Sequence, residues 1–247
     1  MESKKNPSID HGRVYGLDVF RAFAILFVLI GHSFEHSKIP PQLQVFGRLG
    51  ILGVELFFVL SGLLIGSIIM RLIDKNSFQK FSDIVIFWKR RWLRTLPLYF
   101  IALLAFLRFD YHGRHSLVDF PQYFIFMQNF AWKMPEFFEL SWSLAIEEHF
   151  YFWFPLVFLI WKKITKKTHL PVILTAISFI LIAYTYRFFQ PDFSDWDEYN
   201  RLIRLPVLSR IDAIMFGVLI ALINSYWQAG FICIKRLTPF TATLFVM

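Results

Sequence analysis

Two residues that could take part in chemistry, Arg21 and His32, lie eleven positions apart in the otherwise apolar stretch GLDVFRAFAILFVLIGHS. In a helix, eleven steps of about 100° end about 20° past three full turns, so the two side chains share one face. They would be separated by about 16 Å along the axis, roughly half the thickness of a bilayer's hydrocarbon core. Because ionisable groups are costly at that depth, they are candidates for function.

Further polar residues recur in the later apolar stretches, and their types suggest acid–base and phosphate chemistry. A neutral histidine can remove a proton from a hydroxyl near pH 7, and a nearby carboxylate can orient it and stabilise the imidazolium. Arginine binds phosphate through a two-pronged fork. These types favour a phosphate-bearing donor and a hydroxyl acceptor. The further candidates are Glu55, Ser61, Arg91, Arg94, Ser143, Glu147, Arg210 and Asp212.

One of these candidates, Glu147, is followed directly by a second carboxylate, Glu148. Only one helical direction can face the protein interior, so we expect one of the two to face outward. Ser143 and Tyr151 lie four residues on either side of Glu147 and share its stripe. This pattern favours Glu147 as the inward-facing carboxylate.

Each candidate also has a purely structural interpretation. Arg21 and His32 could reach from a helix to the membrane interface. The basic run 89–94 is typical of an anchor that sets topology. Ser61 and Gly62 could simply allow two helices to pack closely. Arg210 and Asp212 could form an ion pair that holds two helices together.

The composition predicts an all-α, polytopic transmembrane helix bundle. Of the 247 residues, 56% are hydrophobic and 19% aromatic, and several apolar runs approach the length needed to cross a bilayer. The single cysteine, Cys233, excludes an intramolecular disulfide and a cysteine-based metal cage, and we expect no metal site. The formal charge of +8 is interpreted as a signal of membrane orientation, so nucleic acid is not an expected partner.

The apolar runs define the expected topology. The segment 121–131 is too short to cross unaided and is expected to be interfacial or re-entrant. With that segment not crossing, the positive-inside rule places residues 1–16 in the cytoplasm as a tail, followed by a transmembrane domain at 17–247. The predicted spans are 17–34, 50–70, 95–109, 143–161, 170–188 and 206–223, with a further apolar run beginning at 237–247.

This orientation predicts two polar levels in the membrane. Three arginines approach the cytoplasmic level, where they could meet a donor arriving from the cytosol. A histidine and several carboxylates approach the outer level. The cytoplasmic group is Arg21, Arg91 and Arg94, and the outer group is His32, Glu55, Glu147, Arg210 and Asp212.

Four local stretches, in order along the chain, resemble the membrane acyltransferase-3 family of bacterial O-acyltransferases. The first is the stretch around Arg21 and His32. It is followed by GVELFFVLSGLLIG at 53–66, KRRWLRTLPLYF at 89–100 and SWSLAIEEHFYFWFP at 141–155. A weaker match is SRIDAIMFGVLIAL at 209–222, and Glu55 stands where an aspartate is the more familiar residue.

The resemblance implies that acyl-CoA, with acetyl as the default acyl group, is the donor co-substrate, and that no cofactor is permanently bound. The acceptor would be a hydroxyl of a cell-surface polysaccharide, another glycan or a lipid-linked saccharide. His32 and Glu147 would be catalytic, and Arg21, Arg91 and Arg94 would bind the donor. The remaining candidates, Glu55, Ser61, Ser143, Arg210 and Asp212, would support them.

The family resemblance also implies a place in the cell, the bacterial cytoplasmic membrane, where lipids are further partners. Its members usually have more spans after the last one predicted here. Since the sequence ends at Met247 within an apolar run, we expect the bundle to be incomplete at its C-terminus. Two alternatives stay open: a transporter or flippase for an acyl group or lipid-linked sugar, and a truncated, inactive family member.

Overall fold

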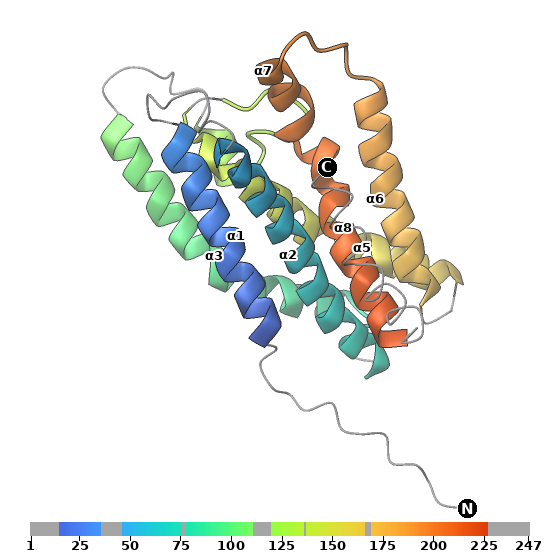
Figure 1. Cartoon of the computed structure of the whole chain (residues 1–247). Helices are drawn as coiled ribbons and strands as arrows, with labels where there is room; N and C mark the ends of the chain where they lie inside the picture. Colours follow the sequence, from blue (N-terminus) through green and yellow to red (C-terminus); the bar gives the residue numbers. More distant parts are fainter. Residues whose placement is uncertain are drawn as a thin grey trace, which may run out of the picture. The chain divides into compact units, whose positions relative to one another are not determined.

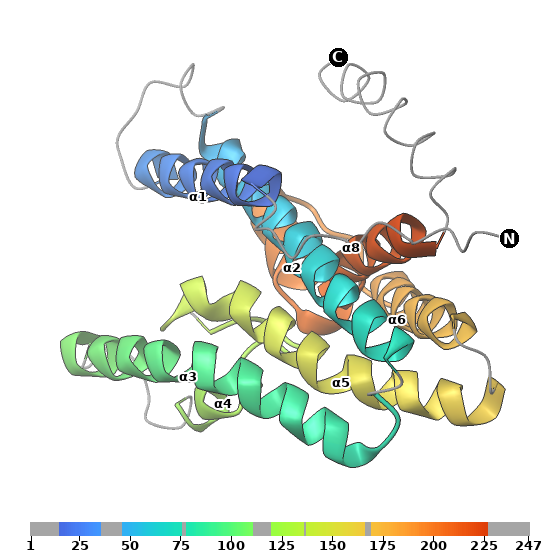
Figure 2. The same ribbon diagram turned by 90° about the horizontal axis from the view of Figure 1, so that it is seen from below.

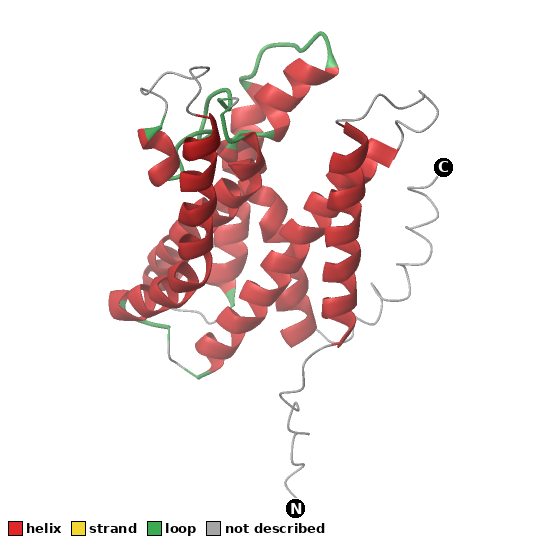
Figure 3. Ribbon diagram, turned by 90° about the vertical axis from the view of Figure 1, so that its left-hand side faces the viewer, coloured by secondary structure: helices red, strands yellow, loops and turns green. Residues whose placement is uncertain are grey.

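The computed structural model describes residues 15–35, 46–75, 78–110, 120–135, 137–165 and 169–226. Within these ranges all regular elements are helices and no strand occurs, which confirms the predicted all-α class (Figure 3). The chain divides into two compact units, residues 1–60 and 61–247, which are described separately. Most of the predicted N-terminal tail and the apolar run at 237–247 lie outside the described residues.

Five helices of the described chain are long and apolar enough to cross a membrane. They cover five of the predicted spans to within a few residues, and they identify a multi-pass membrane protein. Figure 1 labels all five, which are α1 (Tyr15–Glu35), α2 (Leu49–Asp74), α5 (Trp142–Thr165), α6 (Leu170–Phe188) and α8 (Val207–Tyr226).

The helix α3 (Phe81–Asp110) differs from the prediction. A span was expected only from residue 95, but the helix begins at Phe81 and includes the whole basic run. Lysine and arginine are good helix formers, so their charges interrupt the apolar pattern without ending the helix. The helix α3 is not among the five. Pro97 lies inside it, and α3 changes direction partway along its length (Figure 2).

In the first unit, α1 packs against the beginning of α2 through small residues. A Cβ added to Gly50 would lie 3.2 Å from the Cα of Gly31, and one added to Gly53 would lie 2.7 Å from the carbonyl oxygen of Ala24. Small residues let two membrane helices approach backbone to backbone. Much of α1 outside this contact carries exposed apolar side chains, as a lipid-facing helix should; Leu29 is one of them.

The core of the second unit lies between α5, α6 and α8, which pack against one another (Figures 1 and 2). Phenylalanine rings fill it: Phe150 stacks on Phe154 at 5.2 Å between centroids and meets Phe179 of α6 edge-on at 5.8 Å. The second half of α2 approaches α8 at Gly62 and Gly66. The structural interpretation of Gly62 as a close-packing position is therefore correct.

The segment 121–131 forms no helix long enough to span a membrane, which agrees with the expectation that it does not cross. Its only helix, α4 (Pro121–Phe124), has four residues. Phe126 then adopts a left-handed backbone, with φ of 59°, and the chain passes into a buried loop. There the side-chain amide of Asn129 donates to the carbonyls of Trp142 and Leu205, at 3.2 and 2.7 Å, and so ties the loop to the starts of α5 and α8.

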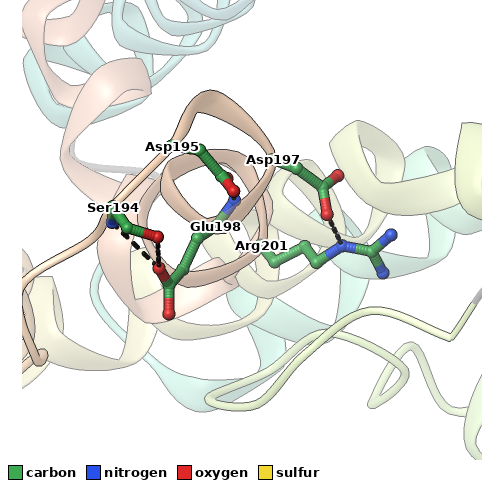
Figure 4. Close-up of polar contacts among 5 residues, drawn as sticks. All are labelled: Ser194, Asp195, Asp197, Glu198 and Arg201. Atoms are coloured by element: carbon green, nitrogen blue, oxygen red, sulfur yellow. Dashed lines mark hydrogen bonds and ion pairs between the residues drawn. The ribbon is translucent and has the colours of Figure 1, made fainter.

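The acidic loop after α6 is held by its own carboxylates (Figure 4). Asp195 caps the short helix α7 (Trp196–Tyr199) by accepting the backbone N–H of Glu198, and the Glu198 carboxylate accepts the backbone N–H of Ser194 at 2.9 Å. This arrangement is similar to a capping box, except that Glu198 bonds the residue before the N-cap. Asp197 pairs with Arg201 of the following π-helical turn, η4 (Asn200–Arg204). The acidic character of the loop is thus explained by local structure.

Asp83 caps the start of α3 and gives the fold a testable pH dependence. Its carboxylate accepts the backbone N–H groups of Gln79 and Lys80, both at 2.8 Å, and these bonds lower its pKa below the ordinary value of 3.8. A lowered pKa stabilises the folded state above the ordinary value, and this stabilisation is lost as the pH falls through the folded value.

We therefore expect Asp83→Ala to lower the thermal unfolding temperature at pH 7, and the difference from the wild type to shrink progressively below about pH 4. Thermal unfolding followed by intrinsic fluorescence, from about pH 2.5 to about pH 7, measures this difference. Asp192→Ala, which removes an exposed loop carboxylate, is the control. A difference that stays constant with pH would contradict the capping role.

Candidate active site

The Glu147 carboxylate is held between two helices of the second unit. The Ser61 hydroxyl of α2 donates to its Oε1 at 2.9 Å, and the Tyr151 hydroxyl, one turn further along α5, donates to its Oε2 at 2.9 Å. Both oxygens therefore have a donor, which fixes the orientation of the side chain. The predicted stripe that pairs Glu147 with Tyr151 is confirmed, and Ser61, predicted as a supporting residue, contacts the carboxylate directly.

Arg91 of α3 lies over the ring of Tyr151. Its guanidinium carbon is 4.4 Å from the centre of the Tyr151 ring, within the range of a cation–π contact. The Arg91 Nε is buried and has no hydrogen-bond partner among the described residues. A buried donor without a partner is costly, so the site gains free energy if a ligand accepts from it.

The backbone of Tyr151 is held by a hydrogen bond from Trp88. The Trp88 indole N–H donates to the backbone carbonyl of Tyr151 at 3.0 Å, and the indole stacks on Phe152 with centroids 4.9 Å apart. Tyr151 is 2% exposed. The ring that contacts both Arg91 and Glu147 is therefore in a rigid setting.

The expectation that one of the two neighbouring carboxylates faces outward is wrong. Glu148 is 4% exposed, and its Oε1 accepts the Thr95 hydroxyl of α3 at 2.8 Å. Adjacent positions on a helix differ by about 100°, and α5 has a neighbour in both directions. Glu147 contacts α2 and Glu148 contacts α3, so both are inside the unit.

The two predicted donor-binding arginines of α3, Arg91 and Arg94, lie in different environments. Arg91 joins the Glu147 cluster through Tyr151, although it was expected near the cytoplasmic level, away from that carboxylate. Arg94, three residues on, is exposed. Ser143 lies half-exposed in the first turn of α5.

The candidates of the first unit lie on α1 and α2. Arg21 and His32 are in one unbroken helix, so their shared face is confirmed. Arg21 donates to Asp18, three residues earlier, at 3.3 Å, and His32 is exposed. Glu55 is half-buried on α2. Cooperation between His32 and Glu147 stays a prediction.

Asp212 forms a helix-joining ion pair, with a partner that the sequence did not indicate. Arg187, at the end of α6, donates to the 6%-exposed Asp212 of α8. The prediction that Asp212 forms a helix-joining ion pair is therefore correct, but its partner is Arg187 and not Arg210. Arg210 is half-buried two residues earlier on α8. Asp212 and Arg187 hold α6 against α8.

Several residues of the site were not predicted. Thr95 and Trp88 lie four and three residues from Arg91, on neighbouring faces of α3, and this helical spacing is the signal that could have found them. Arg187 stands at the end of an apolar run, where a charged side chain is ordinary. Among the described residues no group of three or more histidine, cysteine or acidic side chains could hold a metal ion.

Comparison with known proteins shows the family. A model of the acyltransferase domain matches residues 14–246, so the chain belongs to this acyltransferase family. It is 30% identical over 173 residues to the peptidoglycan O-acetyltransferase OatA of Listeria monocytogenes, covering 62% of this chain and 26% of that protein. It is 31% identical over 173 residues to the putative peptidoglycan O-acetyltransferase YrhL of Bacillus subtilis, covering 63% and 25%.

A putative O-acetyltransferase of Staphylococcus aureus is similar to the same degree, at 30% identity over 169 residues, 62% of this chain and 26% of that protein. The chain therefore matches about a quarter of the length of these relatives. No solved structure matches it.

Proposed function

We propose that this chain transfers an acetyl group from acetyl-CoA to a hydroxyl of a cell-surface glycan, in the bacterial cytoplasmic membrane. The family and the printed names of its relatives support O-acetyl transfer. The observation that carries the proposal is the cluster around Tyr151, where a carboxylate with both oxygens bonded lies beside a guanidinium with an unpaired donor. Such a site can bind an anionic or carbonyl ligand and manage a proton nearby.

The arginines are assigned to the donor. Coenzyme A carries phosphates, which guanidinium groups bind through paired, charge-assisted hydrogen bonds. Arg91 has a buried N–H available, and exposed Arg94 lies one helical turn away. Arg21 is the third member of the set and would exchange its contact with Asp18 for the donor.

The transfer step needs a base and a stabilised charge. The acceptor hydroxyl attacks the thioester carbonyl, its proton passes to His32, and the C–S bond breaks to release the coenzyme A thiolate, which takes up a proton. Glu147 stabilises the imidazolium that forms. Ser61 and Tyr151 keep Glu147 in one orientation, and Asp212 with Arg187 holds α6 and α8 in place. Glu55, Ser143 and Arg210 are assigned supporting roles.

The proposed orientation has the N-terminus in the cytoplasm and requires α3 to cross as a sixth span. Its second half, after Arg94, is apolar, and Leu98 and Ile101 are 73% and 65% exposed, as residues facing lipid would be. With α3 crossing, the basic run 162–167 falls on the same side as the run 89–94, in agreement with the positive-inside rule.

Replacing Arg91 with lysine tests the donor site. Lysine keeps the charge but loses the planar fork and its stacking on Tyr151. We expect the KM for acetyl-CoA to rise about tenfold with a smaller change in kcat, since a charge-assisted hydrogen bond contributes about 1.5–3 kcal/mol. Steady-state transfer from labelled acetyl-CoA in membranes measures both. Arg90→Lys, the exposed neighbour, is the control, and equal KM values for the two variants would contradict the assignment.

Replacing His32 with alanine tests the base. General-base catalysis contributes about a hundredfold or more, so we expect transfer to fall by at least that factor at pH 7. The amount of protein in the membrane should stay the same, because His32 is exposed. Ser33→Ala, at the next position, should keep its activity. Full transfer by a well-expressed His32→Ala protein would remove the histidine from the mechanism.

Mass spectrometry of surface glycans, with and without the chain, tests the function in cells. An O-acetyltransferase adds an alkali-labile, ester-sized mass to a glycan. A transporter or flippase, the alternative class, moves its cargo without forming that ester. Glycans that are identical with and without the chain would count against the proposal.

A further inference from the structure

A groove of about 360 Å³ runs along α3 and is lined only by residues of that helix. The lining begins at Val85 and ends at Phe100, recurring at intervals of three and four residues. The fifteen helical steps from Val85 to Phe100 are about 22 Å long, which is close to half of the roughly 40–45 Å thickness of a bilayer with its headgroups. The groove is therefore as long as one leaflet is deep.

Stacked tryptophans make the wall of this groove rigid. Trp88 and Trp92 are parallel to within 15°, with centroids 5.6 Å apart, and Trp88 is anchored by its hydrogen bond to the Tyr151 carbonyl. Pro97, also in the lining, has no N–H and so leaves the Leu93 carbonyl without its helical partner. The bend in α3 visible in Figure 2 is the expected result.

The groove has one charged residue in its lining, Lys89, at the end where the basic run begins. Lys89 and its neighbour Arg90 are both exposed, and neither forms an ion pair with another residue in the described part of the chain. Asp83, the acidic residue nearest along α3, has its carboxylate occupied by backbone N–H groups. Within the described ranges, the positive charge at this end is therefore not balanced by an ion pair.

We propose that this groove binds one anionic membrane phospholipid. Its phosphate lies against Lys89 and Arg90, and one acyl chain follows Trp92 and Leu96 toward Phe100. The apolar lining of the groove suits the acyl chain, since Leu93 is 68% and Val85 45% exposed. Both side chains would otherwise face loosely held lipid. The unbalanced cations explain the headgroup, as basic positions beside membrane helices attract anionic lipids. The binding does not depend on acyl transfer.

Photo-crosslinking tests the proposal with the full chain in phosphatidylcholine vesicles. The probe is a trace of phosphatidylglycerol with a photoreactive acyl chain, and the labelled residues are mapped by mass spectrometry. We expect labelling concentrated in residues 85–100. Excess phosphatidylglycerol should lower this labelling at least about threefold, whereas the same excess of phosphatidylcholine or acetyl-CoA should leave it unchanged.

Two matched variants separate a site from general surface charge. Lys89→Gln should reduce the labelling of residues 85–100 at least about threefold, and Lys163→Gln, an exposed lysine at the end of α5, should not. Size-exclusion profiles confirm that both variants are folded. Equal labelling of the exposed face of α6, or equal competition by phosphatidylcholine, would mean ordinary surrounding lipid and would overturn the proposal. Competition by acetyl-CoA would assign the groove to the donor and also overturn it.

Discussion

Replacing Glu147 with glutamine is expected to reduce O-acetyl transfer at least about a hundredfold. Glutamine has nearly the same shape and keeps one oxygen for the Ser61 hydroxyl, but it has no negative charge. Its amide nitrogen cannot accept the hydrogen bond that the Tyr151 hydroxyl donates to the carboxylate. The charge that stabilises the imidazolium is therefore lost while the packing is mostly kept. Initial rates of transfer from labelled acetyl-CoA, normalised to protein in the membrane, measure the effect.

The neighbouring Glu148→Gln is the matched control. It makes the same change one position along α5, at a carboxylate bonded to Thr95. We expect transfer to fall by less than about fivefold, the effect of one altered structural hydrogen bond. An equal loss in both variants would contradict the choice of Glu147. In a double variant, His32→Ala with Glu147→Gln should be about as slow as the slower single variant, because residues that act as a unit are not additive.

Replacing Gly62 with alanine is expected to destabilise the second unit by about 1–3 kcal/mol, the usual cost of overpacking. The added methyl group would collide with the Ile214 carbonyl oxygen of α8 and lie 3.0 Å from the Gly217 Cα. Both neighbours are backbone atoms, which cannot turn aside as a side chain does. For a chain of this size, we expect the thermal unfolding temperature to fall by roughly 5 °C.

Gly16→Ala is the control for this experiment. Gly16 also lies in a helix, but a Cβ there meets nothing within 4 Å. Alanine should leave stability unchanged or raise it by up to about 1 kcal/mol, since glycine is the poorer helix former. Unfolding temperatures in the same detergent compare the two. If Gly62→Ala is as stable as Gly16→Ala, the close approach of α2 and α8 is contradicted.

The helices that cross the membrane were predictable because their signal is local. An apolar run of sufficient length marks each one, and 170–188 matches α6 at both ends. The start of α3 was not predictable in this way. Its first half mixes tryptophan and isoleucine with lysine and arginine, and the hydrophobic run that was sought begins only after Arg94. A helix continues through such residues when its backbone bonds and packing are satisfied.

Among the active-site candidates, contacts within one helix could be predicted and contacts between helices could not. Glu147 with Tyr151 could be predicted, because a spacing of four places both on one helical face. The contacts of Glu148 and Arg91 could not, because they depend on which helices lie on either side of α5. Glu147 contacts α2 and Glu148 contacts α3. Arg91 of α3 contacts Tyr151 of α5, which lies 60 residues later in the sequence. Tertiary packing alone decides such pairs.

The most direct test of acetyl transfer uses sealed membrane vesicles that contain the full chain and acetyl-CoA labelled in its acetyl group. The vesicles carry a glycan acceptor, and the label is followed into alkali-labile glycan ester. Wild-type chain should form labelled ester, and the Glu147→Gln chain should form almost none. Label that crosses the membrane without becoming glycan ester, or equal ester formation by both chains, would contradict the proposal that this cluster performs O-acetyl transfer.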